Sequence, residues 1–246
     1  MDYDPKEFTL IEYERLLSIA KKRHVFKKYS NIKNVDDNFI VWRHDVDHSL
    51  EQSAIVAKIE KKNAIQSTYF LHLHNEFYNA MDFRSSELIK NILSLGHSVG
   101  LHFDFAYYDI QSTNELEHWL TIEKNILEAL FKTKISAFSF HNPTDFSMKF
   151  ERDMYAGMIN TYSKYYKNNV EYCSDSNGYW RYRKLAEVLD DKSIVRLQVL
   201  THPEWWTREE MLPREKIKKY IEFRALETLA NYDGILEAFG RVNIGA

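Results

Sequence analysis

An apolar run passes directly into charged and imidazole side chains in the segment Phe39-Ile40-Val41-Trp42-Arg43-His44-Asp45-Val46-Asp47-His48. The apolar half is typical of a buried strand. Because strand side chains alternate between two faces, Asp45 and Asp47 point the same way, about 7 Å apart. Two carboxylates at the carboxyl end of a parallel strand suit a divalent cation or an acid/base pair, and α/β folds usually place their chemistry there. The alternative interpretation is a solvated strand end with a salt bridge to Arg43.

The composition indicates a globular chain with a sizeable core. The 246 residues are 44% hydrophobic and 15% aromatic, and the formal net charge is -3. That charge gives no reason to expect nucleic acid or an acidic membrane surface as a partner. The single Cys173 excludes an internal disulfide and a multi-cysteine zinc site. The first residues lack an apolar signal core, and no apolar run reaches 18 residues, so we expect a soluble, cytoplasmic protein without a membrane span.

Strand and helix patterns alternate along the chain without a linker or a break in composition. Helices are predicted at about 8–22, from Ser49 onward, at 85–95, at 113–131 and, as a long closing helix, at about 214–238. Strands are predicted at 39–48, 67–74, 97–104, 135–141 and 193–202. Between residues 144 and 191 the periodicity weakens. The alternation predicts one α/β domain over residues 1–246, with a parallel sheet that is open or closed into a barrel.

Polar side chains end strand after strand in this pattern. They are Asp45 and Asp47, His72 and His74, His102 and Asp104, His141, and His202. A single histidine at a strand end is more often structural, but parallel strands deliver their carboxyl ends to one rim. Asp and His ligands with an open position are typical of a catalytic divalent metal site. The chain has no Gly-rich phosphate loop and no Gly-x-Ser-x-Gly elbow.

Five motifs occur in an order that resembles a known family. They are Arg43-His44-Asp45-Val46-Asp47, Ser67-Thr68-Tyr69-Phe70, Gly96-His97-Ser98-Val99-Gly100-Leu101-His102, Ser139-Phe140-His141-Asn142-Pro143 and Leu200-Thr201-His202-Pro203-Glu204-Trp205-Trp206. Over about residues 8–210 the chain resembles the polysaccharide deacetylase family (carbohydrate esterase family 4, the chitooligosaccharide deacetylase-like group), in particular its soluble branch associated with bacterial surface-polysaccharide clusters. The resemblance implies an irregular (β/α) barrel of about seven parallel strands. It also implies removal of an acetyl group, N-acetyl more than O-acetyl, from a sugar polymer with a divalent metal, usually zinc.

The resemblance assigns roles to particular residues. Asp45 matches the general base and Asp47 the neighbouring metal ligand, although Val46 separates two residues that are adjacent in the family, so the roles could be exchanged. His102 matches the first histidine of the H-S/T-x-x-H metal motif. The second histidine would fall at position 106, where this chain has Ala106.

The missing histidine leaves the third ligand open. Candidates are Asp104, His141, and the pair His72 and His74; otherwise the metal is bound loosely or not at all. His141 leads because it stands where the family usually has an arginine.

The resemblance also implies which residues act as the general acid. Asp175 matches the aspartate that pairs with the histidine acid, and His202 matches that acid. Trp205 and Trp206 are expected either to wall the sugar site or to pack beneath the rim.

The sequence is consistent with two main classes of function. The first is a metal-dependent hydrolase acting on an acetylated sugar or polysaccharide, with Zn as the favoured ion and Ni, Co or Mn as alternatives. The second is a deacetylase-fold protein without catalysis that binds a glycan or scaffolds polysaccharide biosynthesis. Ala106 favours the second, whereas the retained Asp45, Asp47, His102 and His202 favour the first. A hydrolase of a non-sugar amide is a third reading.

Overall fold

The protein was analysed as a computed structural model that describes residues 3–32 and 38–245. Within them, one mixed sheet has the strand order β5-β6-β4-β3-β2-β1-β8-β7. All of its neighbouring strands run parallel except β5 and β6. The strands are β1 Phe39–Val46, β2 Thr68–Leu71, β3 Ser98–Asp104, β4 Ala137–His141, β5 Met154–Tyr155, β6 Met158–Asn160, β7 Glu171–Ser174 and β8 Arg196–Thr201. The predicted α/β class with a largely parallel sheet is therefore confirmed.

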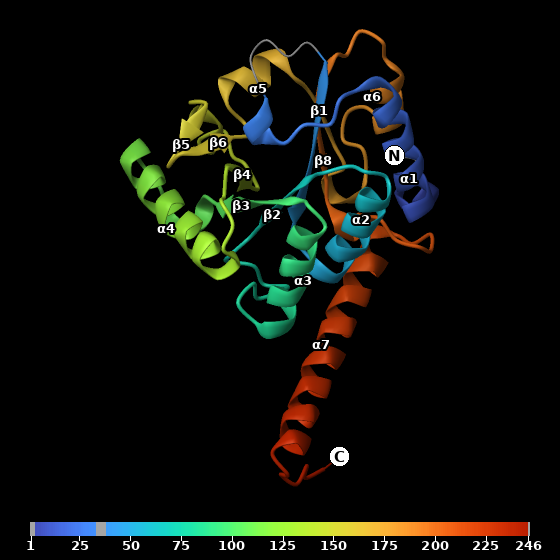
Figure 1. The fold of residues 1–246 in the computed structure, drawn as a ribbon, viewed down its shortest axis with the longest axis vertical. Coiled ribbons are helices and arrows are strands. Elements are labelled where there is room, and N and C mark those ends of the chain that lie inside the picture. Colours follow the sequence, from blue (N-terminus) through green and yellow to red (C-terminus); the bar gives the residue numbers. More distant parts are fainter. Residues whose placement is uncertain (1–2, 33–37, 246) are drawn as a thin grey trace.

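Helices connect the strands and cover the outside of the sheet (Figure 1). They are α1 Leu10–Arg23, α2 Leu50–Lys62, α3 Phe83–Ser94, α4 Thr113–Phe131, α5 Lys164–Asn169, α6 Leu185–Asp190 and α7 Pro213–Ala238. Local sequence sets the ends of several of them. The side chains of Thr9 and Ser49 cap α1 and α2 by accepting backbone N–H groups. Gly96 follows α3 with a φ of 96°, a conformation that glycine adopts without strain.

The apolar side chains form three cores. One lies between β2, β3 and β4 and the helices α3 and α4, and contains Leu71, Phe103 and Leu120. A second lies between β1, β8 and the helices α1 and α6, and contains Trp42 and Leu17. The third fills the concave inside of the sheet.

The alternation of side chains along β1 separates the inside of the sheet from the helical layer. Phe39 and Val41 belong to the inner core, whereas Ile40 and Trp42 pack toward α1. Arg43 continues the inner row and donates a hydrogen bond to Thr161, which directly follows β6. A strand side chain that reaches across to another part of the sheet indicates that the sheet is curled.

The structure adds three details to the predicted irregular barrel. The described sheet has eight strands instead of about seven, β5 is antiparallel, and β5 and β7 are edge strands, so the barrel is a half-barrel. Strands β5, β6 and β7 lie in the stretch 144–191 where the sequence pattern is weak. Strand β2 ends at Leu71, so His72 and His74 belong to the following loop.

No helix in the described part of the chain is long and apolar enough to cross a membrane.

Candidate metal centre

Three side chains from three segments converge at the carboxyl ends of the central strands. Asp47 follows β1, His102 lies in β3 and His141 ends β4. Asp47 Oδ1 lies 3.2 Å from His102 Nε2 and 3.5 Å from His141 Nδ1. The two imidazole nitrogens are 3.1 Å apart. We call Asp47, His102 and His141 the metal triad.

The triad has the dimensions of a tetrahedral metal site. Ligand atoms at about 2.0–2.1 Å from a tetrahedral zinc ion lie about 3.3–3.4 Å apart, close to the three observed separations. Asp47 Oδ1 is buried and has no hydrogen-bond partner in the described residues. A buried carboxylate oxygen without a donor is costly, and a cation would satisfy it. Two imidazoles and one carboxylate, with one position open, are a donor set that fits a divalent ion such as zinc.

A second layer of contacts orients His102. Its Nδ1 lies 2.7 Å from Ser139 Oγ, and Ser139 Oγ lies 3.3 Å from Asp45 Oδ1. This contact fixes the ring and leaves Nε2 facing the triad. Metal-binding histidines usually have such a partner on the second ring nitrogen. Ser139 was not singled out from the sequence, although its position two residues before His141 in β4 places both side chains on one face.

Asp45 lies beneath the triad in a buried ion pair. Arg43 Nη2 is 3.2 Å from Asp45 Oδ2, and both side chains are almost fully buried. The same guanidinium donates to the hydroxyl of Tyr162 at 2.7 Å. Burial alone would lower the pKa of Arg43, but the Asp45 carboxylate raises it well above its usual value. The salt bridge between Arg43 and Asp45 therefore exists, but it is buried and not solvated as the alternative interpretation expected.

His202 approaches the triad from β8 and is held by Asp175. Its Nε2 lies 3.7 Å from Asp47 Oδ2, and its Nδ1 lies 2.6 Å from Asp175 Oδ1. Asp175 also accepts the backbone N–H of His202 at 3.0 Å and the indole N–H of Trp206 at 3.2 Å. Burial alone would lower the pKa of His202, but the Asp175 carboxylate outweighs it and raises the pKa to about 10.

These groups face one cavity of about 410 Å³. Its lining includes the aspartates Asp45 and Asp47 and the three histidines, together with the aromatic residues Tyr162, Tyr172 and Tyr182. Neither Trp205 nor Trp206 lines this cavity. Both indoles are buried, and Trp206 packs against Phe8 and Tyr13. Of the two roles predicted for these tryptophans, the structure therefore favours packing.

The other candidates for the third ligand lie outside the triad. His72 Nε2 is 3.6 Å from Asp104 Oδ2, and the His72 ring faces that of His141 with centroids 4.4 Å apart. Asp104 instead accepts the backbone N–H of Ala106 at 3.0 Å.

The remaining candidate histidine belongs to a separate group. His74 Nε2 lies 2.7 Å from the Tyr108 hydroxyl and 3.1 Å from Glu123 Oε1. Among the candidates from the sequence, the structure thus places His141 beside Asp47 and His102, and it places Asp47 rather than Asp45 there.

No family model and no curated protein matches the chain. Among solved structures, the chain is similar to a CE4 family pseudoenzyme from Bacillus anthracis, at 18% identity over 76% of this chain and 62% of that one, with a TM-score of 0.45. It is similar to the chitin deacetylase from the fungal pathogen Colletotrichum lindemuthianum at 15% identity over 75% and 81%, with a TM-score of 0.45.

A third similar structure is a peptidoglycan N-acetylglucosamine deacetylase, at 16% identity over 86% of this chain and 91% of that one, with a TM-score of 0.47. The chain therefore spans less than two thirds of the length of the Bacillus anthracis protein. The structural similarity is to CE4 polysaccharide deacetylases at low sequence identity.

Proposed function

We propose that the chain is a divalent-metal-dependent hydrolase that removes an acetyl group, N-acetyl more than O-acetyl, from a sugar of a surface polysaccharide or its precursor. The observation that carries the proposal is the metal triad, with ligand atoms 3.1–3.5 Å apart, beside Asp45 and the His202–Asp175 pair in one cavity. A site that only binds a glycan has no need of a metal triad flanked by an acid and a base.

The acid and the base have distinct surroundings in this cavity. Asp45 accepts hydrogen bonds from Arg43 and Ser139, which hold its carboxylate in place to take a proton from the attacking water. As an imidazolium, His202 donates its Nδ1 proton to Asp175 and carries a second proton on Nε2, which lies 3.7 Å from Asp47 Oδ2. That proton is placed to pass to the sugar nitrogen as the amide C–N bond breaks and acetate forms.

A bound divalent ion, which we propose to be zinc, would polarise the acetyl carbonyl and lower the pKa of the attacking water. Asp47, His102 and His141 would hold it. The proposal thereby gives His141 the role that the absent histidine at position 106 would have. The exposed Tyr172 and Tyr182, which line the cavity, offer apolar faces on which a sugar ring can stack.

The alternative is a protein that keeps the fold and binds an acetylated glycan without hydrolysis. Ala106, an exposed residue without a metal-binding side chain, is the observation that favours it. The two readings differ in whether acetate is released.

The test measures acetate release from acetylated chitooligosaccharides and from acetylated xylan by the zinc-loaded protein. We expect turnover that the variant His202→Ala lowers by about 10²–10⁴-fold while zinc stays bound, as for the loss of a general acid. His118→Ala, which removes an exposed histidine of α4, serves as the matched control and should leave turnover unchanged. Equal rates in the His202→Ala variant and the wild type would remove His202 from the mechanism. Binding of these glycans without any acetate release would favour the alternative.

A further inference from the structure

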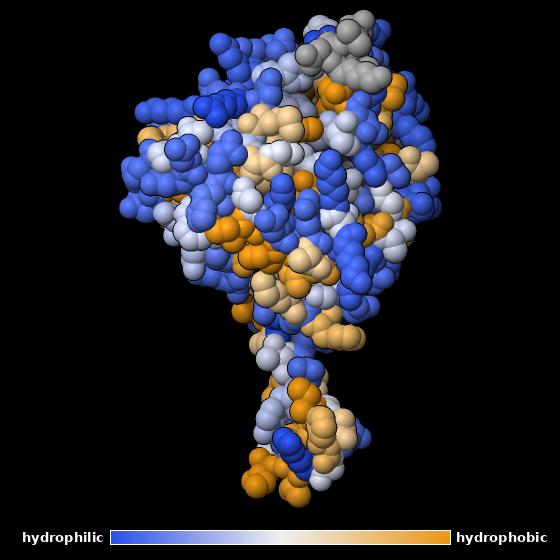
Figure 2. Space-filling model, turned by 60° about the vertical axis from the view of Figure 1, so that its left-hand side comes forward, coloured by the Kyte–Doolittle hydropathy of each residue, from blue (hydrophilic) through white to orange (hydrophobic). Residues whose placement is uncertain are grey.

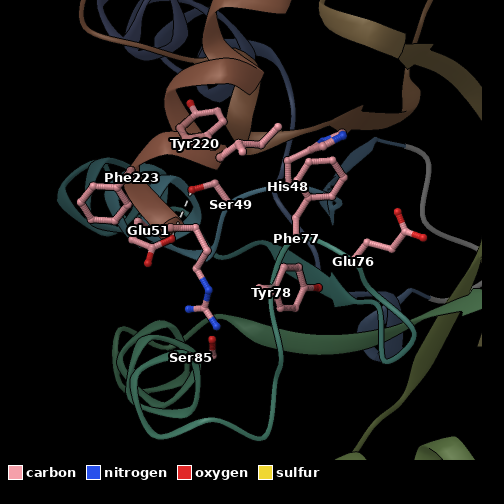
Figure 3. A pocket seen from close by; sticks show the side chains of 11 residues that line it. His48, Ser49, Glu51, Glu76, Phe77, Tyr78, Ser85, Tyr220 and Phe223 are labelled. Carbon is pink, nitrogen blue, oxygen red and sulfur yellow. Dashed lines mark hydrogen bonds between the residues drawn. The ribbon is translucent and has the colours of Figure 1, made fainter. Parts of the chain in front are cut away.

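Helix α7 leaves the body of the protein and ends far from it (Figure 1). Its 26 residues extend about 39 Å at 1.5 Å per residue. The first half is anchored: the Tyr220 hydroxyl donates to Glu204 O at 2.8 Å, and Arg224 pairs with Asp82 at 2.6 Å. Figure 3 shows Tyr220 and Phe223 of this half over a small cavity that His48 and Tyr78 also line.

The second half has no comparable anchor. Glu227 forms an ion pair with Arg84 of α3, and it is the last residue of α7 to bond to the body. In the described residues 229–245, no hydrogen bond or ion pair reaches a strand or another α-helix. Helical segments of this length are marginal in water unless an apolar face is packed. The second half therefore needs a surface to pack against.

An apolar stripe runs along this half. Residues 221, 225, 229, 232, 236 and 239 are apolar and recur at spacings of three or four residues, which places them on one face of the helix. Leu229 is 58% exposed, Tyr232 54% and Phe239 71%. Figure 2 shows hydrophobic residues gathered on this projecting part. The α7 residues that line the groove toward α3 are mostly polar, among them Arg224, Glu227 and Asn231, so the stripe faces away from α3.

The charges of this half disfavour a membrane as its partner. Residues 225–245 contain three acidic side chains, Glu227, Asp233 and Glu237, against the single basic Arg241. Helices that lie on anionic bilayers carry Lys and Arg on their polar face. A protein surface is the partner that fits.

A second copy of the chain supplies a surface of the right size. Four large side chains of the stripe, Ile221, Leu229, Tyr232 and Phe239, and the two that flank it, Leu226 and Ile235, are each 46–71% exposed. At roughly 100 Å² apiece they offer about 600 Å² per copy, or about 1,200 Å² for two, which reaches the lower limit of stable interfaces. A patch of this size is at the upper end of what soluble monomers leave exposed.

We propose that two copies of this chain associate through the apolar stripe of α7, with the two helices antiparallel about a twofold axis near residue 230. In that arrangement the two bodies lie at opposite ends of the helix pair. A parallel pair would instead place both bodies at the same end of the helix pair.

The first experiment measures the mass of the full chain in solution by light scattering on a sizing column. A dimer of two 29.4 kDa chains, about 59 kDa, is expected at micromolar concentration. The double variant Leu229→Glu with Tyr232→Glu should run as a monomer. Ile11→Glu, which changes an 81% exposed side chain of α1, should remain dimeric. A monomeric wild type, or a dimer that survives the double variant, overturns the proposal.

The second experiment tests the direction of the helices by disulfide cross-linking. Leu229→Cys should cross-link two copies because it lies next to the axis, whereas Phe239→Cys should not. Cross-linking of both variants would indicate a parallel pair and overturn the antiparallel arrangement. The natural Cys173 does not interfere, because burial raises its pKa to about 12. If the wild type is monomeric in solution and floats with vesicles of phosphatidylcholine and phosphatidylglycerol, the stripe binds a membrane. That result would overturn the proposed dimer.

Discussion

Replacing Asp175 by asparagine keeps the shape of the side chain and removes its charge. Asp175 is fully buried and accepts hydrogen bonds from His202 Nδ1, from the His202 backbone and from the Trp206 indole. Raising the pKa of His202 from 6.5 to about 10 corresponds to about 5 kcal/mol, at 1.36 kcal/mol per pH unit. Since Asp175 is the largest of the charged contributions, we expect Asp175→Asn to lower the free energy of unfolding by about 3–5 kcal/mol at pH 6.

The sign of the pH dependence follows from the direction of the change. The pKa of His202 is higher in the folded state than in the unfolded state, so the stabilisation is fully present below pH 6.5. It is lost as the pH rises toward 10. The difference in unfolding free energy between wild type and Asp175→Asn should therefore shrink on raising the pH from 6 to 10.

NMR titration of the His202 ring in metal-free protein is the direct assay. In the wild type His202 should stay protonated through pH 8, and in Asp175→Asn it should titrate near or below 7. Trp206→Phe removes one hydrogen bond from Asp175 but keeps its charge, so this control should leave the pKa of His202 well above 6.5. A wild-type pKa at or below 6.5 would refute the assigned role of Asp175.

Three further predictions concern other parts of the chain. Ser139→Ala removes the partner of His102 Nδ1 and should weaken zinc affinity about 10–100-fold without unfolding the protein, as measured by competition with a chelating dye. Gly100→Ala would place a Cβ 2.5 Å from the Phe70 ring and should cost about 1–3 kcal/mol in urea unfolding, whereas Gly234→Ala, with open space around it in α7, should stabilise by up to about 1 kcal/mol. The pKa of Glu60 falls to about 2, because the His44 charge outweighs burial. The wild type should therefore lose this stabilisation as the pH falls from 4.5 toward 2. In Glu60→Gln the free energy of unfolding should depend less on pH over this range. An equal pH dependence in the two proteins would contradict the role given to Glu60.

The fold was predictable where side-chain periodicity and helix caps agree. The helix predicted at 113–131 coincides with α4 Thr113–Phe131, and the short polar side chains of Thr9 and Ser49 cap α1 and α2. Strands β5, β6 and β7 were missed because they have two to four residues, too few to display a period. Their place in the sheet depends on tertiary contacts such as the hydrogen bond from Gln198 to Thr161 O, which no local pattern encodes.

The candidate site was predictable as a set of strand ends but not in its supporting contacts. Asp45, Asp47, His102, His141 and His202 all line one cavity, as the convergence of parallel strands predicts. The choice among His141, His72 and Asp104 needed coordinates, because all three follow or end strands and differ only in where their polar atoms point. Glu60 was missed for another reason. It lies on α2 and meets His44 of β1, a contact between two residues that are 16 positions apart in the sequence.

The central claim is that Asp47, His102 and His141 hold one divalent ion, and zinc content tests it most directly. The wild type, stripped with a chelator, reloaded with zinc and gel-filtered, should retain about one equivalent by elemental analysis. His74→Ala removes a neighbouring histidine outside the triad and should retain the same amount, whereas His141→Ala should retain almost none. A full equivalent in His141→Ala, or no zinc in the folded wild type, would contradict the account.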